Sequence, residues 1–245
     1  MIDPGAIRAM ANRFQTTADN VVREYFQHLF LSHLYREKKA DQWLFKGGTA
    51  LRIIWRSPRF SEDLDFTGIR LSASSAEHLL GKVTTSLEQE GLRVVSEEGK
   101  PTSGGYLAIL RLEGGEYRAR IQLQVSFRTS GKEIGSALLI ASDLVPPYSL
   151  MHLEIPILVR EKINALLTRA KPRDFYDLYF ILRQRLGFAE VFQFDKSLKP
   201  RLVDAISRSR LDAKSELKRF LPVNQHNLLK DFLSVLRSEV ERSLP

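Results

Sequence analysis

Apolar side chains recur every three or four residues in two parts of the chain, which is the pattern of amphipathic helices. In the first part, the spacing predicts a long helix over residues 6–38, a short one over 50–55 and a third over 75–91. The second part begins after residue 150, and its spacing predicts helices over 158–169, 174–186, about 199–219 and 227–243.

Strict alternation of apolar and polar residues predicts strands between these helical parts. Residues 106–112 and 118–128 alternate on either side of a glycine-containing turn and predict a hairpin. On its second strand, Gln122 and Gln124 share the polar face. Residues 63–66 predict a further short strand.

Two adjacent prolines, Pro146 and Pro147, exclude a helix where they stand and mark the clearest boundary in the chain. We therefore expect an α+β protein. Residues 1–145 would form an α/β domain on a small mixed sheet, and residues 146–245 a mainly helical domain.

The composition is that of a soluble globular protein: 43% of the 245 residues are hydrophobic and 27% are charged. No stretch approaches the ~20 apolar residues of a membrane span, and residues 1–10 lack the apolar run of a secretory signal, so we expect a cytoplasmic protein without a membrane partner. The absence of cysteine excludes disulfides, thiolate metal sites and cysteine catalysis.

The positive charge is concentrated in the second part of the chain. Residues 151–245 hold 18 Lys and Arg against 12 Asp and Glu, whereas residues 1–150 hold 19 against 17, and the whole chain carries +8. Such a surplus suits a polyanionic partner such as RNA, and it equally suits simple solubility.

Gly47, Gly48 and Thr49 are a candidate phosphate-binding turn. Two glycines without Cβ atoms let the backbone approach a ligand closely, and a helix beginning at Thr49 would present free N–H groups to phosphate. The hydroxyl of Thr49 could cap that helix or donate to a phosphate oxygen. The same triplet also fits an ordinary helix start with no ligand.

Asp63 and Asp65 are a candidate metal site. Residues two apart on a strand point the same way, so both carboxylates would project together. Neighbouring carboxylates raise each other's pKa unless a cation lies between them, and Mg²⁺ prefers such oxygen ligands. An exposed strand face beside basic residues is the alternative.

The spacing of the two motifs favours a common site. Arg59, Ser61 and the two aspartates follow the glycine turn after one short helix, which would bring a phosphate site and a metal site together. Metal ions in such a site bridge a triphosphate, activate an attacking oxygen and stabilise the departing pyrophosphate.

Residues 46–51 and 59–66 resemble the AbiEii/AbiGii-type nucleotidyltransferase toxins, and residues 160–166 and 172–179 supply a second match. The resemblance spans about residues 20–185. It implies a polymerase β-like nucleotidyltransferase domain that uses Mg²⁺ and an NTP. It also implies the toxin of a toxin–antitoxin pair, with an antitoxin protein as partner and RNA, such as the tRNA 3′ end, as acceptor.

The second match contains Lys162 and Asp174. Lys162 could hold a triphosphate oxygen as a compact cation, and the resemblance implies that role for it and a place in the site for Asp174. We expect Asp174 to cap its helix and to pair with Lys162 or Arg169, and Asp177 to be a structural partner. The alternative is a salt-bridge network that joins two helices.

Gln124 is where the chain departs from the family pattern. Polymerase β-like enzymes usually place a third carboxylate on a later strand, near this position. Glutamine can accept a hydrogen bond or bind a metal weakly, but it cannot deprotonate a nucleophile. Three explanations stay open: one tightly held metal with another acid such as Asp174, a slowed enzyme, or nucleotide binding without transfer.

Two other functions compete with nucleotidyl transfer to RNA. One is a non-catalytic nucleotide- or RNA-binding protein on the same fold, and the other is nucleotidyl transfer to a small molecule or a protein hydroxyl. Eight basic residues of the helical part would favour RNA, although acidic residues interleave with them: Lys196, Lys199, Arg201, Arg208, Arg210, Lys214, Lys218 and Arg219.

Overall fold

The chain forms two compact units in the computed structural model, which describes residues 3–128, 135–187, 190–191, 195, 197–209 and 216–244. Unit 1 comprises Met1–Arg56 and Phe60–Leu153, and unit 2 comprises Ser57–Arg59 and Glu154–Pro245. The backbone thus leaves unit 1 for three residues and then returns to it.

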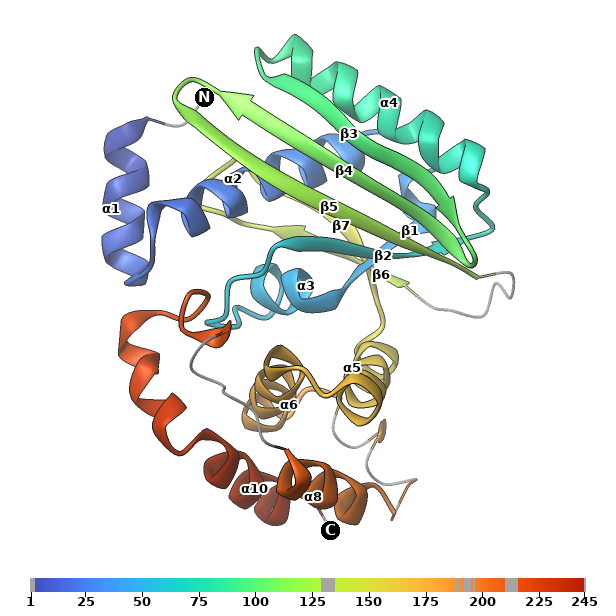
Figure 1. The fold of residues 1–245 in the computed structure, drawn as a ribbon. Coiled ribbons are helices and arrows are strands. Elements are labelled where there is room, and N and C mark those ends of the chain that lie inside the picture. The colour runs from blue at the N-terminus through green and yellow to red at the C-terminus, as the bar shows by residue number, and fades with distance from the viewer. Residues whose placement is uncertain are drawn as a thin grey trace. The chain divides into compact units, whose positions relative to one another are not determined.

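Unit 1 is built on one seven-stranded mixed sheet with the strand order β3-β4-β5-β2-β1-β7-β6 (Figure 1). Its strands are β1 (Trp43–Lys46), β2 (Asp63–Ile69), β3 (Arg93–Thr102), β4 (Gly105–Gly114), β5 (Tyr117–Arg128), β6 (Gly135–Ile140) and β7 (Tyr148–Leu153). β2 runs parallel to β5 and β1 parallel to β7, whereas the other neighbours are antiparallel. The expected α+β fold on a mixed sheet is confirmed.

Two long helices cover one face of this sheet. The helices of unit 1 are α1 (Pro4–Phe14), α2 (Ala18–Leu34), α3 (Gly47–Ile53) and α4 (Ala73–Gln89), with a 3₁₀ turn η1 (Ala40–Gln42). α2 packs against β5 and β7, α4 against β3 and β4, and the two helices contact each other. Burial of Phe26 and Phe30 on α2 and of Val83 and Leu87 on α4 supplies the apolar area that holds these helices to the sheet.

The single helix expected over residues 6–38 is wrong, because two helices occupy this range. α1 ends at Gln15, which adopts a left-handed backbone with φ 51°. Thr17 then caps α2, and its hydroxyl accepts a hydrogen bond from the backbone N–H of Asn20. Apolar spacing continues across this break, so periodicity alone does not reveal it.

Four strands were not predicted from the sequence. β1 has only four residues, all buried, and so shows no alternation. β3 is an edge strand with mostly exposed residues, and its polar sequence shows no alternation. β6 and β7 flank the proline pair and form a hairpin. Because β7 pairs with β1 at Phe45 and His152, unit 1 continues to Leu153, and the boundary expected at 145/146 falls between two strands of the same sheet.

Unit 2 is helical. It contains α5 (Ile155–Arg169), α6 (Pro172–Gln184), α8 (Leu198–Arg208), the 3₁₀ segment η2 (Val223–Lys230) and α10 (Phe232–Ser243). α10 packs on α6 and α8, and the rings of Tyr176 and Phe232 stack with their centroids 6.1 Å apart.

Two helix predictions for unit 2 differ from the structure. The helix expected over 199–219 ends at Arg208 as α8, and residues 210–215 lie outside the described part of the chain. The helix expected over 227–243 begins only at Phe232, because Asp231, with φ −125°, leaves the helical conformation after η2. In the described part of the chain, no helix combines the length and apolar character that crossing a bilayer requires.

Candidate functional site

The glycine turn lies against a candidate metal ligand. Gly47 follows β1 directly, opens α3 and adopts φ +83°, a left-handed backbone that favours glycine. A Cβ atom built on Gly47 would lie 2.8 Å from both the Cβ and the Cγ of Asp65, which is closer than non-bonded carbon atoms approach each other. The backbone of the turn therefore passes directly over the side chain of Asp65, and only glycine fits there.

Thr49 is fully buried, and its hydroxyl donates to the backbone carbonyl of Asp63. The N-cap of α3 is Lys46, whose side chain makes no capping hydrogen bond. In this structure Thr49 therefore joins α3 to β2 instead of capping the helix, and its hydroxyl proton is used within the protein.

Asp63 and Asp65 project from one face of β2. Both are partly exposed, whereas Leu64 and Phe66 between and after them are fully buried on the other face. This is the alternation expected of a strand with one face in the core. The sequence-predicted carboxylate pair is therefore brought together on a half-exposed surface.

Two neighbouring strands, β1 and β5, extend this polar face in register. Lys46 of β1 and Gln124 of β5 are the cross-strand partners of Asp65, and Gln122 is the partner of Asp63. Residues opposite each other in a sheet share a face, so the two carboxylates lie in a strip with a lysine on one side and two glutamines on the other. We call these five residues the carboxylate face. Gln124 is exposed, and Lys46 is 9% exposed.

The donors of the carboxylate face fit a hard cation. Two carboxylates and two amide carbonyls are oxygen ligands of the kind that Mg²⁺ prefers. Within the described residues, no group of three or more His, Cys, Asp or Glu is placed to hold a metal. The chain thus supplies two carboxylates here and a neutral amide where a third would stand.

The segment before β2 is fixed by α2. Gln27, which is 1% exposed, donates from Nε2 to the backbone carbonyls of Ser61 and Glu62 at 3.0 and 3.1 Å. Ser61 is half-buried. This anchoring holds the chain in place immediately before Asp63.

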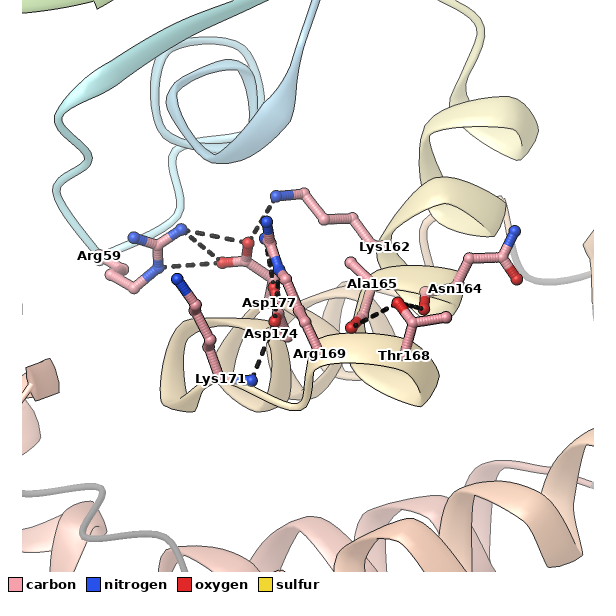
Figure 2. Close-up of polar contacts among 9 residues, drawn as sticks. All are labelled: Arg59, Lys162, Asn164, Ala165, Thr168, Arg169, Lys171, Asp174 and Asp177. Atoms are coloured by element: carbon pink, nitrogen blue, oxygen red, sulfur yellow. Dashed lines mark hydrogen bonds and ion pairs between the residues drawn. The ribbon is translucent and has the colours of Figure 1, made fainter.

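In unit 2, Asp177 of α6 joins two cations (Figure 2). Lys162 of α5 donates from Nζ to Oδ2 at 2.7 Å. Arg59 donates from Nε and Nη2 to Oδ1 at 2.9 and 2.8 Å, and from Nη2 to Oδ2 at 3.1 Å. One carboxylate therefore holds Lys162, the expected triphosphate ligand, and Arg59, which was expected beside the phosphate and metal sites.

This cluster is almost fully buried. The side chains of Asp177, Arg59 and Lys162 are 2%, 4% and 12% exposed. Burial alone would raise the pKa of Asp177, but the charges and hydrogen bonds of Arg59 and Lys162 outweigh it and lower that pKa below its ordinary value. Asp177 is therefore ionised at neutral pH, and losing it would remove the carboxylate that both buried cations share.

Asp174 makes a separate ion pair one turn earlier on α6. Its oxygens accept from Nε and Nη2 of Arg169 at 2.9 and 2.7 Å, and Oδ2 also accepts from the backbone N–H of Lys171 at 3.1 Å. Asp174 itself is fully buried. Of the two partners that the sequence offered for Asp174, the structure selects Arg169, whereas Lys162 pairs with Asp177.

The predicted residues fall into two groups. Unit 1 brings together Asp63, Asp65 and Gln124 with the Gly47-Gly48 turn, and Thr49 and Ser61 lie in the segments beside them. Unit 2 holds Arg59, Lys162 and Asp174. Lys46 was not predicted as a site residue, because its place beside Asp65 follows only from the pairing of β1 with β2. Asp177 is a structural partner, as expected, but its pairing with Arg59, 118 positions away in the chain, was not predicted.

Comparison with known proteins gives one family match and two solved structures. Residues 29–237 match the model of the nucleotidyl transferase AbiEii toxin family of type IV toxin–antitoxin systems. JHP933 from Helicobacter pylori is 20% identical with a TM-score of 0.62, over 93% of this chain and 92% of that one. A candidate nucleotidyltransferase from H. pylori is 20% identical with a TM-score of 0.59, over 90% and 92%. At this identity the likeness concerns the fold. No curated protein matches the sequence.

Proposed function

Because the chain belongs to the AbiEii family of nucleotidyl transferase toxins, we propose that it is a Mg²⁺-dependent enzyme that moves a nucleoside monophosphate from an NTP to RNA. The acceptor in this proposal is the 3′-hydroxyl of a tRNA, and a cognate antitoxin counters the toxin. The observation that carries the proposal is the close approach of the Gly47 backbone to Asp65 on a face that also holds Asp63.

The carboxylate face supports the metal in this proposal. Asp63 and Asp65 would hold Mg²⁺, and Gln124 would add a neutral oxygen or orient a water beside it. Bound there, the ion would neutralise charge on the triphosphate and on the departing pyrophosphate. Lys46 lies on the other side of Asp65, where its charge favours an anionic substrate.

The buried cluster of unit 2 supports a role for Lys162 in triphosphate binding. Its ammonium group is fixed by Asp177 at 2.7 Å, so little side-chain entropy would be lost when it takes a phosphate oxygen. Arg59 is held on the same carboxylate and thereby keeps Asp177 ionised. We infer that Asp177 and Arg59 position Lys162.

The case for an RNA acceptor rests on charge. The residues of 151–245 carry a surplus of +6, with 18 basic against 12 acidic side chains. Arg201 pairs with Asp195 and Arg208 with Asp204, both as exposed ion pairs that contribute little and can open. Lys218 and Arg219 are exposed. Three more of the expected basic residues lie outside the described part of the chain: Lys196, Arg210 and Lys214.

Incubating the protein with tRNA, Mg²⁺ and each labelled NTP in turn tests the transfer. We expect the wild type to label tRNA, and Asp65→Asn to lower the rate at least about 100-fold, because a preorganised charge at the reacting phosphate is worth about 3–4 kcal/mol. Asp19→Asn, which removes an exposed carboxylate in the first turn of α2, is the matched control and should keep the wild-type rate. No label in any RNA from the wild type would overturn the proposal.

Gln124 favours a second candidate, a protein that binds nucleotide without transferring it. With an amide as the register partner of Asp65, the site lacks the acid that would deprotonate the attacking hydroxyl. Mg²⁺-dependent NTP binding with no turnover would support this candidate. Gln124→Glu distinguishes it from a slowed enzyme, because an added carboxylate should raise the rate of an enzyme that is only slow.

A further inference from the structure

Unit 1 contains a cavity of about 340 Å³ that none of the carboxylate face residues lines. It is bounded by the end of α1, by α2, by the C-terminal end of α3 and by residues 141–144, which connect β6 to β7. This volume lies at the lower end of the range for small-molecule sites and is several times that of a phosphate ion.

Three arginines and two carboxylates line the cavity, and the arginines differ in how firmly they are held. Arg52 makes a largely buried pair with Glu24, with Nε and Nη2 donating at 2.8 and 3.3 Å, and so belongs to the fixed wall. Arg13 pairs with Asp143, but both side chains are more than half exposed, and such a pair is worth at most about 1 kcal/mol. Arg56 is exposed and has no ion pair among the residues that the structure describes.

The cavity also has a buried polar wall. His28 is 4% exposed, and its Nδ1 lies 2.8 Å from the hydroxyl of Tyr148. Its Nε2 lies 3.4 Å from Oγ of Ser142, which in turn accepts from the backbone N–H of Leu144 at 3.1 Å. The ring of Phe14 adds an apolar surface. The cavity is therefore lined by two exposed cations, Arg13 and Arg56, by an aromatic ring and by buried hydrogen-bonding groups.

We propose that this cavity binds a small phosphate monoester of the size of a nucleoside monophosphate, at a site separate from the carboxylate face. Arg56 and Arg13 hold the phosphate, since Arg56 has its fork of donors available and Arg13 can exchange the exposed Asp143 for a doubly charged group. The organic part of the ligand lies toward Phe14 and Ser142. This binding requires neither Mg²⁺ nor nucleotidyl transfer.

Calorimetric titration in EDTA tests the proposal without contributions from metal-dependent binding. The probes are AMP, inorganic phosphate and adenosine, and the proteins are the wild type, Arg56→Gln and Arg185→Gln. Arg185 is the matched control, because it is an exposed arginine outside this cavity with φ 52°, close to the 59° of Arg56. We expect AMP to bind the wild type and Arg185→Gln equally and to bind Arg56→Gln at least tenfold more weakly. Phosphate and adenosine alone should bind more weakly than AMP.

A second variant covers the case in which Arg56→Gln disturbs the local fold. Ala141→Leu adds bulk to the cavity wall and should also weaken AMP binding, with the melting temperature unchanged. No heat from AMP at millimolar concentration, or equal affinity in Arg56→Gln and the wild type, would overturn the proposal. Equal affinity for phosphate and AMP would overturn the nucleoside part. Asp65→Asn should bind AMP normally, so failure of the proposed transfer reaction leaves this result intact.

Discussion

Asp177 illustrates how one buried carboxylate sets the position of two cations. It has almost no exposed surface, so its charge is stable only because Arg59 and Lys162 both bind it. Its lowered pKa expresses the same coupling, since the ionised form is the one that the two cations favour. The conformation of Lys162 in this protein is therefore a property of three residues and not of the lysine alone.

His28 should make unit 1 sensitive to acid. Burial, together with the positive charge of Arg52, lowers the pKa of His28 to about 4 from its ordinary 6.5. Above pH 6.5 both folded and unfolded states hold a neutral ring and His28 has no effect. Below it the unfolded state binds a proton that the folded state excludes, so stability falls. The expected loss between pH 7.5 and 4.5 is about 2.5 kcal/mol.

Urea unfolding at the two pH values measures this loss. In His28→Gln the difference between the two free energies of unfolding should shrink by about 2.5 kcal/mol, because glutamine does not titrate. His78→Gln, which changes an exposed histidine on α4, should keep the full difference. An equal pH dependence in all three proteins would contradict the buried, neutral state of His28.

Candidate site residues could be predicted where the sequence pattern that places them spans only a few positions. Asp63 and Asp65 were predicted because alternation on a strand acts over two positions. The pairing of Arg169 with Asp174 spans five positions and was among the options. Arg59 and Asp177 lie 118 positions apart, and only tertiary packing brings them together. No periodicity in the sequence contains that information.

At the scale of elements, the short helix α3 depends on a single glycine at its start. Gly47 combines a left-handed backbone with a close approach to the side chain of Asp65. Thr49, two residues later, donates to the carbonyl of Asp63 and so attaches the same helix to β2. The helix and the strand that carries the carboxylates are therefore fixed against each other at two points.

Gly47→Ala should be much more harmful than Gly91→Ala. Both glycines adopt left-handed backbones, with φ +83° and +88°, but a Cβ at Gly91 meets nothing within 4 Å. Gly91→Ala should cost about 1–2 kcal/mol from backbone strain alone. Gly47→Ala adds the collision with Asp65 and should cost clearly more. Urea unfolding of both variants measures the difference, and equal losses would contradict the close approach of Gly47 to Asp65.

Helices were easier to predict here than strands, for a physical reason. α4 and α5 each bury one face, and that face is visible as a spacing of three and four residues. β3 is an exposed edge strand whose polar residues show no alternation. β7 depends on its partner β1, about a hundred positions earlier. Such strands are defined by their neighbours in the sheet and leave little trace in their own sequence.

At the scale of the whole molecule, the uneven charge predicts how RNA binding should respond to salt. If three phosphates are contacted by the basic residues of 151–245, affinity for tRNA should fall about 20- to 40-fold between 50 and 200 mM salt. Fluorescence anisotropy with labelled tRNA measures this. Lys218→Gln should flatten the response, whereas Lys100→Gln in β3 should leave it unchanged. An affinity for tRNA that does not depend on salt would contradict binding through the basic residues of 151–245.

The passage of residues 57–59 through unit 2 limits how this protein can be divided or recombined. The backbone crosses between the units after Arg56, after Arg59 and after Leu153. No single cleavage therefore yields two self-contained fragments, because a piece ending at Leu153 keeps Arg59 and loses Asp177, its buried counter-ion. A chimaera that takes its helical half from a homologue must also take the tripeptide 57–59, or Arg59 will be separated from Asp177, the carboxylate that it pairs with here.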